Sequence, residues 1–169
     1  MNFSRKLGIP TAAVAFALAA AACGSSSGYS ATGAGANDGG AMAAATSAPS
    51  TSVALANGKF GPMLVDPTGR TLYLFEADKG TTSTCYSACA QAWPPLLTSG
   101  PPHAGNGLVA ADLATTSRTD GKSQVTYHGH PLYYYVVDTK PGDINGQDLN
   151  QFGAKWYVLG PNGNKIDNG

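Results

Sequence analysis

The sequence is poor in charge and contains a single glutamate. Only 12% of the 169 residues are charged, with ten basic and ten acidic side chains, and Glu76 is the one glutamate. Such sparse and balanced charge does not provide the basic surface that binds a nucleic-acid backbone, so we expect no nucleic-acid partner. The carboxylate pair that glycoside cleavage needs would have to come from aspartates, and nothing in their spacing selects two of them.

Common catalytic motifs are absent as well. The chain has no Gly-x-Ser-x-Gly elbow, no His-Glu-x-x-His metal motif and no phosphate-binding loop. We therefore expect no enzyme and no cofactor. The 22 glycines and 11 prolines favour turns and linkers over long helices.

The N-terminal segment has the pattern of an export signal. Arg5 and Lys6 precede an apolar run, residues 7–22, that ends in small alanines and is too short to span a membrane comfortably. Cys23 follows at once, and the junction resembles the lipobox of bacterial lipoproteins. The resemblance implies a signal peptide over residues 1–22 and a lipid on Cys23 that anchors the protein to the outer face of a cell membrane. An ordinary secretory signal with a chance cysteine is the alternative.

Two regions of different composition follow the signal. Residues 23–56 are mostly Gly, Ala, Ser and Thr, and we expect a disordered linker there because no core can be built from them. In residues 57–169, short apolar and aromatic runs alternate with turn residues, which is typical of strands. The expected strands are 63–65, 71–75, 110–117, 123–127, 131–137 and 155–159, with a short helix around 84–92.

A block of residues recurs 60 positions later in the chain. Gly69, Leu72, Tyr73, Phe75 and Asp78 are matched by Gly129, Leu132, Tyr133, Tyr135 and Asp138. The copies extend over about residues 59–97 and 119–161. The repeat predicts a mainly β fold in which two related antiparallel β-hairpin or meander units pack together, face to face, with one short helix.

Both copies carry the motif Tyr-x-(Phe/Trp/Tyr)-x-x-Asp. Together with the cysteine-containing segment that ends in Trp93-Pro-Pro and the later Gly142-Asp-Ile-Asn-Gly146, the motif resembles the bacterial predicted lipoproteins known as secreted repeats of unknown function. The resemblance implies a cell-envelope location and a compact domain, but no established reaction. The expected function is a non-catalytic binding or structural module whose partner is an unknown envelope protein or small ligand.

Alternation along a strand assigns the motif side chains to different roles. Tyr73 and Phe75 face one side of the strand and the flanking leucines the other, while Asp78 lies past the strand end, where its carboxylate closes a turn. The same holds for Tyr133, Tyr135 and Asp138. The alternative for the aspartates is a cation site completed by a loop of alternating oxygen ligands, namely Asp143, Asn145 and Asp148.

Cys85 and Cys89 are four positions apart. On a helix their Cα atoms would lie about 6 Å apart, within disulfide reach, and export favours oxidation. The alternative is a copper-binding or thiol-redox site in which both thiols act together with a histidine, the metal candidates being Cys85, Cys89, His128 and His130. A disulfide would leave Cys23 as the odd cysteine, which suits a residue that carries lipid.

Trp93 and Trp156 have two possible roles. A small domain needs its aromatic residues in the core, so we expect both to be buried. The alternative is an exposed aromatic groove for a glycan or peptide, since aromatic side chains offer an apolar face and, in Tyr and Trp, a polar tip.

Overall fold

The computed structural model describes residues 50–167, and this part of the chain is mainly β. The described residues belong to one compact unit of the chain. Its strands are β1 (Ser52–Gly58), β2 (Gly61–Val65), β3 (Tyr73–Phe75), β4 (Leu97–Thr98), β5 (His103–Ala104), β6 (Leu113–Ser117), β7 (Ser123–Tyr127), β8 (His130–Pro131), β9 (Asn150–Gln151) and β10 (Ala154–Val158), with one short helix, α1 (Ala88–Ala92), and a 3-10 turn, η1 (Ala110–Asp112). The predicted fold class is confirmed.

β1 was not predicted and begins inside the expected linker. It pairs antiparallel with β2, with Ala54 opposite Val65 and Ala56 opposite Met63. The expectation that the linker extends to residue 56 is therefore wrong at its end, because small residues can form a strand when a partner strand covers them. The expected signal peptide, Cys23 and the rest of the linker lie outside the described residues.

Each copy contains a hairpin followed by a short returning segment. In the second copy, β6 pairs with β7, and β7 pairs with β8 across the predicted turn at His128-Gly129. Both turn residues have positive φ, 46° and 83°, which matches the twist of a two-residue hairpin. In the first copy β1 pairs with β2 in the same way, but the predicted pairing of β2 with the segment after its turn is reduced to a bridge between Val65 and Thr71.

Most predicted elements are present but shorter than expected. β3 covers only Tyr73–Phe75 and so begins later than the expected strand at 71–75, while β8 covers only His130–Pro131 and ends well before residue 137. The first three residues of the expected strand at 110–117 form η1.

The helix is also shorter, because it begins at Ala88 and not at residue 84. Ser87 has a φ of 50°, which no α-helix accommodates, so the chain turns sharply before α1. Within residues 50–167 no helix is long and apolar enough to cross a membrane.

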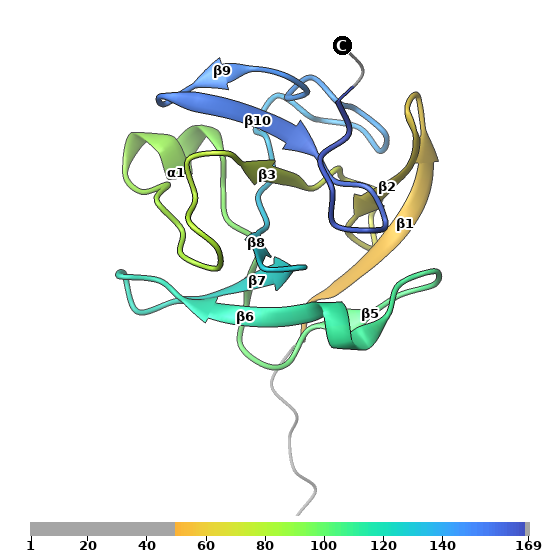
Figure 1. Cartoon of the computed structure of the whole chain (residues 1–169), viewed down its shortest axis with the longest axis horizontal. Helices are drawn as coiled ribbons and strands as arrows, with labels where there is room; N and C mark the ends of the chain where they lie inside the picture. Colours follow the sequence, from red (N-terminus) through yellow and green to blue (C-terminus); the bar gives the residue numbers. More distant parts are fainter. Residues whose placement is uncertain (1–49, 168–169) are drawn as a thin grey trace, which may run out of the picture. The chain divides into compact units, whose positions relative to one another are not determined.

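The two copies exchange their last segments. β10, from the second copy, pairs with β3 of the first copy, and the N–H of Leu64 donates to the carbonyl of Leu159. In the same way β4, from the first copy, pairs with β7 of the second, and the N–H of Val125 donates to the carbonyl of Leu96. Figure 1 shows β10 running beside β3. The units are thus interleaved, which is a closer association than the face-to-face packing expected.

The copies also meet at their motif tyrosines. The N–H of each tyrosine donates to the carbonyl of the other, at 2.9 Å from Tyr73 and 3.0 Å from Tyr133. This antiparallel bridge joins equivalent residues of the two copies, so an approximate twofold relation between the copies passes through it. Both side chains belong to the same core cluster, so a contact made by one tyrosine can be repeated by the other.

The core lies on both sides of the central strands. Leu72 and Leu74 belong to a mainly aliphatic cluster, while Tyr73 and Phe75 belong to a second cluster that contains both tryptophans. The predicted alternation along this strand is confirmed. Both faces are buried, so the motif lies in the interior of the domain.

Candidate functional site

The motif side chains form two reciprocal hydrogen bonds between the copies. The hydroxyl of Tyr73 donates to the Asp138 carboxylate at 2.5 Å, and that of Tyr133 donates to Asp78 at 2.7 Å. Each tyrosine therefore bonds the aspartate of the other copy. The sequence located all four residues but paired none of them, because the repeat has no signal for which copy supplies the partner.

The aspartates also close turns, as the sequence predicted. Asp78 accepts bonds from the backbone N–H and the hydroxyl of Thr84, at 2.7 and 2.8 Å. Asp138 accepts bonds from the backbone N–H and the side-chain amide of Asn145, at 2.9 and 3.1 Å. Each carboxylate thus receives three donors, two from its own loop and one from the other copy.

Burial raises the pKa of every member of these pairs, the two aspartates and the two tyrosines. It raises the pKa of Asp78 and Asp138, against the lowering effect of their tyrosine donors. It raises the pKa of Tyr73 and Tyr133 far above the ordinary value, and the neighbouring aspartate raises it further. The phenols therefore stay protonated.

A four-ring stack joins the copies on the side of the tyrosines. Trp93 and Trp156 lie face to face with ring centroids 3.9 Å apart. Phe75 covers the outer face of Trp156 at 4.0 Å, and Tyr135 covers that of Trp93 at 4.1 Å. Both tryptophans are fully buried. The predicted core role is therefore confirmed. The two tryptophans do not form an exposed aromatic groove.

Cys85 and Cys89 form a disulfide, with Cα atoms 5.2 Å apart. Cys85 precedes α1, so the bridge spans the turn at Ser87 and does not lie along one helix face, as the spacing suggested. Both cysteines are buried beside the tryptophan stack. The bridge pins the start of α1 to the loop that follows Asp78.

Arg118 is a buried hub that the sequence did not single out. Its guanidinium donates to the Ser83 hydroxyl at 2.8 Å, to the Gln124 side-chain oxygen at 2.6 Å and to the Cys85 carbonyl at 2.8 Å. Only 1% of its side chain is exposed, yet it also reaches the half-exposed Asp120 at 3.3 Å. An isolated arginine before an Asp-Gly turn gives no sequence signal for such burial.

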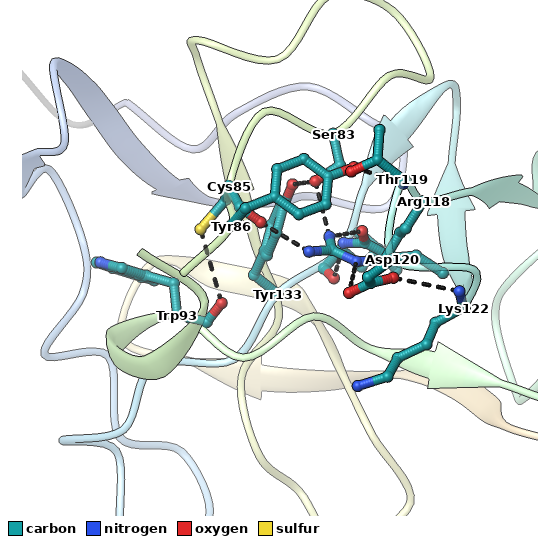
Figure 2. Close-up of polar contacts among 11 residues, drawn as sticks. Ser83, Cys85, Tyr86, Trp93, Arg118, Thr119, Asp120, Lys122 and Tyr133 are labelled. Atoms are coloured by element: carbon teal, nitrogen blue, oxygen red, sulfur yellow. Dashed lines mark hydrogen bonds and ion pairs between the residues drawn. The ribbon is translucent and has the colours of Figure 1, made fainter. Parts of the chain in front are cut away.

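The hub connects to the motif through Ser83. The Tyr133 hydroxyl lies 2.8 Å from the Ser83 hydroxyl, so a chain of hydrogen bonds runs from Asp78 through Tyr133 and Ser83 to Arg118. Figure 2 shows the guanidinium facing the ring of Tyr86, whose centroid is 4.3 Å away. A carboxylate and a guanidinium are thus held at the two ends of one buried network.

The candidate copper ligands are not brought together. Cys85 and Cys89 are bonded to each other, and His128 pairs with Asp112 at 3.3 Å. His130 lines the hollow described below, and neither cysteine is among its lining residues. Among residues 50–167 no three His, Cys, Asp or Glu side chains are grouped as a metal site.

In the loop considered as an alternative cation site, the two carboxylates already have partners within the protein. The Asp143 carboxylate accepts the N–H groups of Thr139 and Lys140, and Asp148 pairs with Lys155 at 2.7 Å. Asn145 bonds Asp138 through its donors. These side chains close their own loops and turns.

A hollow of about 500 Å³ opens beside Asp78. Its lining combines the apolar Leu74 and Phe75 with Glu76, Asp78 and His130, and the C-terminal segment at residues 163–165 forms another wall. Such a volume is within the range of small-molecule sites. Two further hollows, of about 660 and 630 Å³, contain one charged lining residue between them, Lys122. Of these three hollows in the described part of the chain, the one at Asp78 is where several titratable groups converge.

Comparison with known proteins agrees with the internal repeat. The model of a family described as a secreted repeat of unknown function matches the chain twice, over residues 54–97 and 114–159, together just over half of the chain. Each match begins earlier than the copies expected from sequence and so includes most of β1 and of β6. No curated protein and no solved structure matches the chain.

Proposed function

The chain belongs to the family of secreted repeats of unknown function, and from this premise we propose that it is a lipid-anchored, non-catalytic binding or structural module of the cell envelope. The anchor is a lipid on Cys23, and the domain faces the extracytoplasmic side. Its partner is an envelope protein or a small ligand, and not a nucleic acid.

The observation that carries the non-catalytic part of the proposal is the use of the motif by the fold. The hydroxyls of Tyr73 and Tyr133 donate hydrogen bonds to Asp138 and Asp78. The aromatic residue at the third position of each motif, Phe75 or Tyr135, covers one end of the tryptophan stack. Repeated residues are natural candidates for catalysis. In this domain they make contacts that hold the two copies together. A duplicated structural element accounts for a duplicated motif.

Cysteine usage supports the anchored part of the proposal. Three cysteines are present, and the structure pairs Cys85 with Cys89. Cys23 has no intramolecular disulfide partner left, and an unpaired thiol is an awkward product of export to an oxidising compartment. A thioether-linked diacylglycerol removes that thiol and supplies two acyl chains, which suffice for stable anchoring.

The test is a Cys23→Ala variant of the full chain, with Ser25→Ala as a matched control that keeps the cysteine. We expect Cys23→Ala to move from the membrane fraction to the soluble fraction or the medium, while the control stays with the membrane. Mass spectrometry of the unaltered protein is expected to show a lipid-bearing peptide that begins at Cys23. Membrane retention of Cys23→Ala equal to that of the control contradicts the anchor.

A further inference from the structure

The two motif aspartates have equal hydrogen bonding but unequal access. Asp138 is buried, with 3% of its surface exposed, whereas Asp78 is only partly buried and lines the hollow described above. Both receive three donors, and a carboxylate has about four acceptor positions. Asp78 therefore has acceptor capacity left where a ligand can reach it.

The two copies differ in how closely a neighbouring loop packs against the hairpin turn. A Cβ added to Gly69, in the first-copy turn, would lie 2.9 Å from Pro141, because the loop after Asp138 packs against that turn. A Cβ added to the equivalent Gly129 would have no atom within 4 Å. The loop after Asp78 thus leaves space that its counterpart fills. The first-copy turn is covered by a loop and the second-copy turn is open. The open space beside the second-copy turn is therefore not something that the repeat itself requires.

The charge of the hollow is negative. Glu76 and Asp78 contribute two carboxylates, while Lys165 is held by Glu76 at 2.8 Å and by Asp167 at 3.4 Å. The contact with Glu76 offsets one carboxylate against the lysine, so the unpaired charge of the lining is that of Asp78. The cation nearest to Asp78 is the buried Arg118, which lies behind Tyr133 and Ser83 and does not line the hollow. A positive group of a ligand is therefore the complementary charge.

His130 adds a polar group with spare bonding capacity. Within residues 50–167 its imidazole makes no hydrogen bond, and burial lowers its pKa, so the ring is neutral near pH 7 and can donate or accept. Leu74 and Phe75 provide an apolar part of the same lining. The site thus combines a carboxylate, an uncommitted imidazole and an apolar surface.

We propose that the hollow beside Asp78 binds a small organic cation, an ammonium or guanidinium group on an apolar stem. The cation lies against the Asp78 and Glu76 carboxylates, the imidazole of His130 bonds a neighbouring polar atom, and the stem contacts Leu74 and Phe75. The inference rests on the proposed binding role and gives it a ligand class. The same chemistry is present in a free polyamine and in a basic side chain of a partner protein.

The test is calorimetric titration of the full chain, in neutral detergent, with three probes. Nα-acetylarginine amide represents a basic side chain, spermidine represents a free polyamine, and Nα-acetylcitrulline amide is the uncharged match for the first. We expect saturable binding of at least one cationic probe and binding of the citrulline probe at least about tenfold weaker, since a charge-assisted bond is lost. The tighter cationic probe identifies the source.

Variants assign the binding to the hollow. Asp78→Asn is expected to weaken the cationic probe at least about tenfold, whereas Asp138→Asn, which alters the equivalent buried carboxylate, should change it less than about twofold. Glu76→Gln, at an exposed position where the carboxylate pairs with Lys165, is expected to weaken binding about threefold. Equal loss in the two aspartate variants, no effect of Glu76→Gln, or equal binding of the citrulline probe overturns the proposal. None of these readouts depends on lipid at Cys23, so the anchor and the cation site fail separately.

Discussion

Replacing Trp156 with alanine is expected to lower the free energy of unfolding by about 3–5 kcal/mol, the usual cost of truncating a buried tryptophan. The ring is fully buried and is covered on one face by Trp93 and on the other by Phe75. Its removal leaves a gap in the middle of the stack and deprives the Gln151 carbonyl of the indole N–H that donates to it at 3.1 Å. Denaturant titration of the folded domain measures the loss.

Phe152→Ala is the matched control for this variant. Phe152 is the residue next to Gln151, is 48% exposed and has a strained φ of 58°. Alanine also carries a Cβ and meets the same backbone strain, so only the exposed ring is lost and the free energy of unfolding should change by less than about 0.5 kcal/mol. Trp156→Phe should fall between the two, because it keeps a stacked ring. A loss at Trp156 no larger than at Phe152 contradicts a packed stack.

Arg118→Met is expected to cost about 3 kcal/mol or more, although methionine retains much of the side-chain volume. The Nε2 of Gln124 is committed to the Leu132 carbonyl at 2.8 Å, so its oxygen faces Arg118 and loses its donor in the variant. The Cys85 carbonyl loses its donor as well, while the Ser83 hydroxyl keeps its bond with Tyr133. Each buried polar group left without a partner costs about 1–3 kcal/mol.

Arg70→Met separates the effect of the hub from that of arginine in general. The Arg70 guanidinium lies 4.2 Å over the Tyr134 ring at a partly exposed position. We expect a cost below about 1 kcal/mol, the size of an exposed cation–π contact. Thermal unfolding of both variants at one pH provides the comparison. Similar midpoints for the two variants would mean that the buried network does not stabilise the domain.

The sequence predicted the local elements better than their pairing. Turn residues and alternation located β7, the turn at Gly129 and β10, because those signals lie within a few residues of one another. The exchange of β4 and β10 between the copies joins residues far apart in the chain, and both copies offer each strand the same kind of partner. Alternation cannot choose between two such partners.

Some residues of the candidate site could be predicted from local sequence patterns, and others could not. The motif residues were found from their repetition, and the disulfide from the spacing of Cys85 and Cys89. Arg118 and the accessibility of Asp78 were not found, because both depend on packing around a single residue. Asp78 and Asp138 look alike in the sequence, and only the surrounding loops make one of them accessible.

A single copy of the repeat lacks the bonding partners of its own motif residues. One copy alone contains a motif tyrosine and a motif aspartate, but each has its partner in the other copy. One copy also contains half of the aromatic stack. A single copy therefore cannot satisfy its own buried groups, which explains why the repeat occurs here as an interleaved pair.

The central claim is that the motif bonds across the copies, and a pair of double-mutant cycles tests it most directly. Combining Tyr73→Phe with Asp138→Ala should give a coupling energy of about 1.5–3 kcal/mol, as for a hydrogen bond to a charged group. Combining Tyr73→Phe with Asp78→Ala, the aspartate of the same copy, should give less than about 0.5 kcal/mol. The opposite order, with coupling inside a copy and none between copies, would contradict the account.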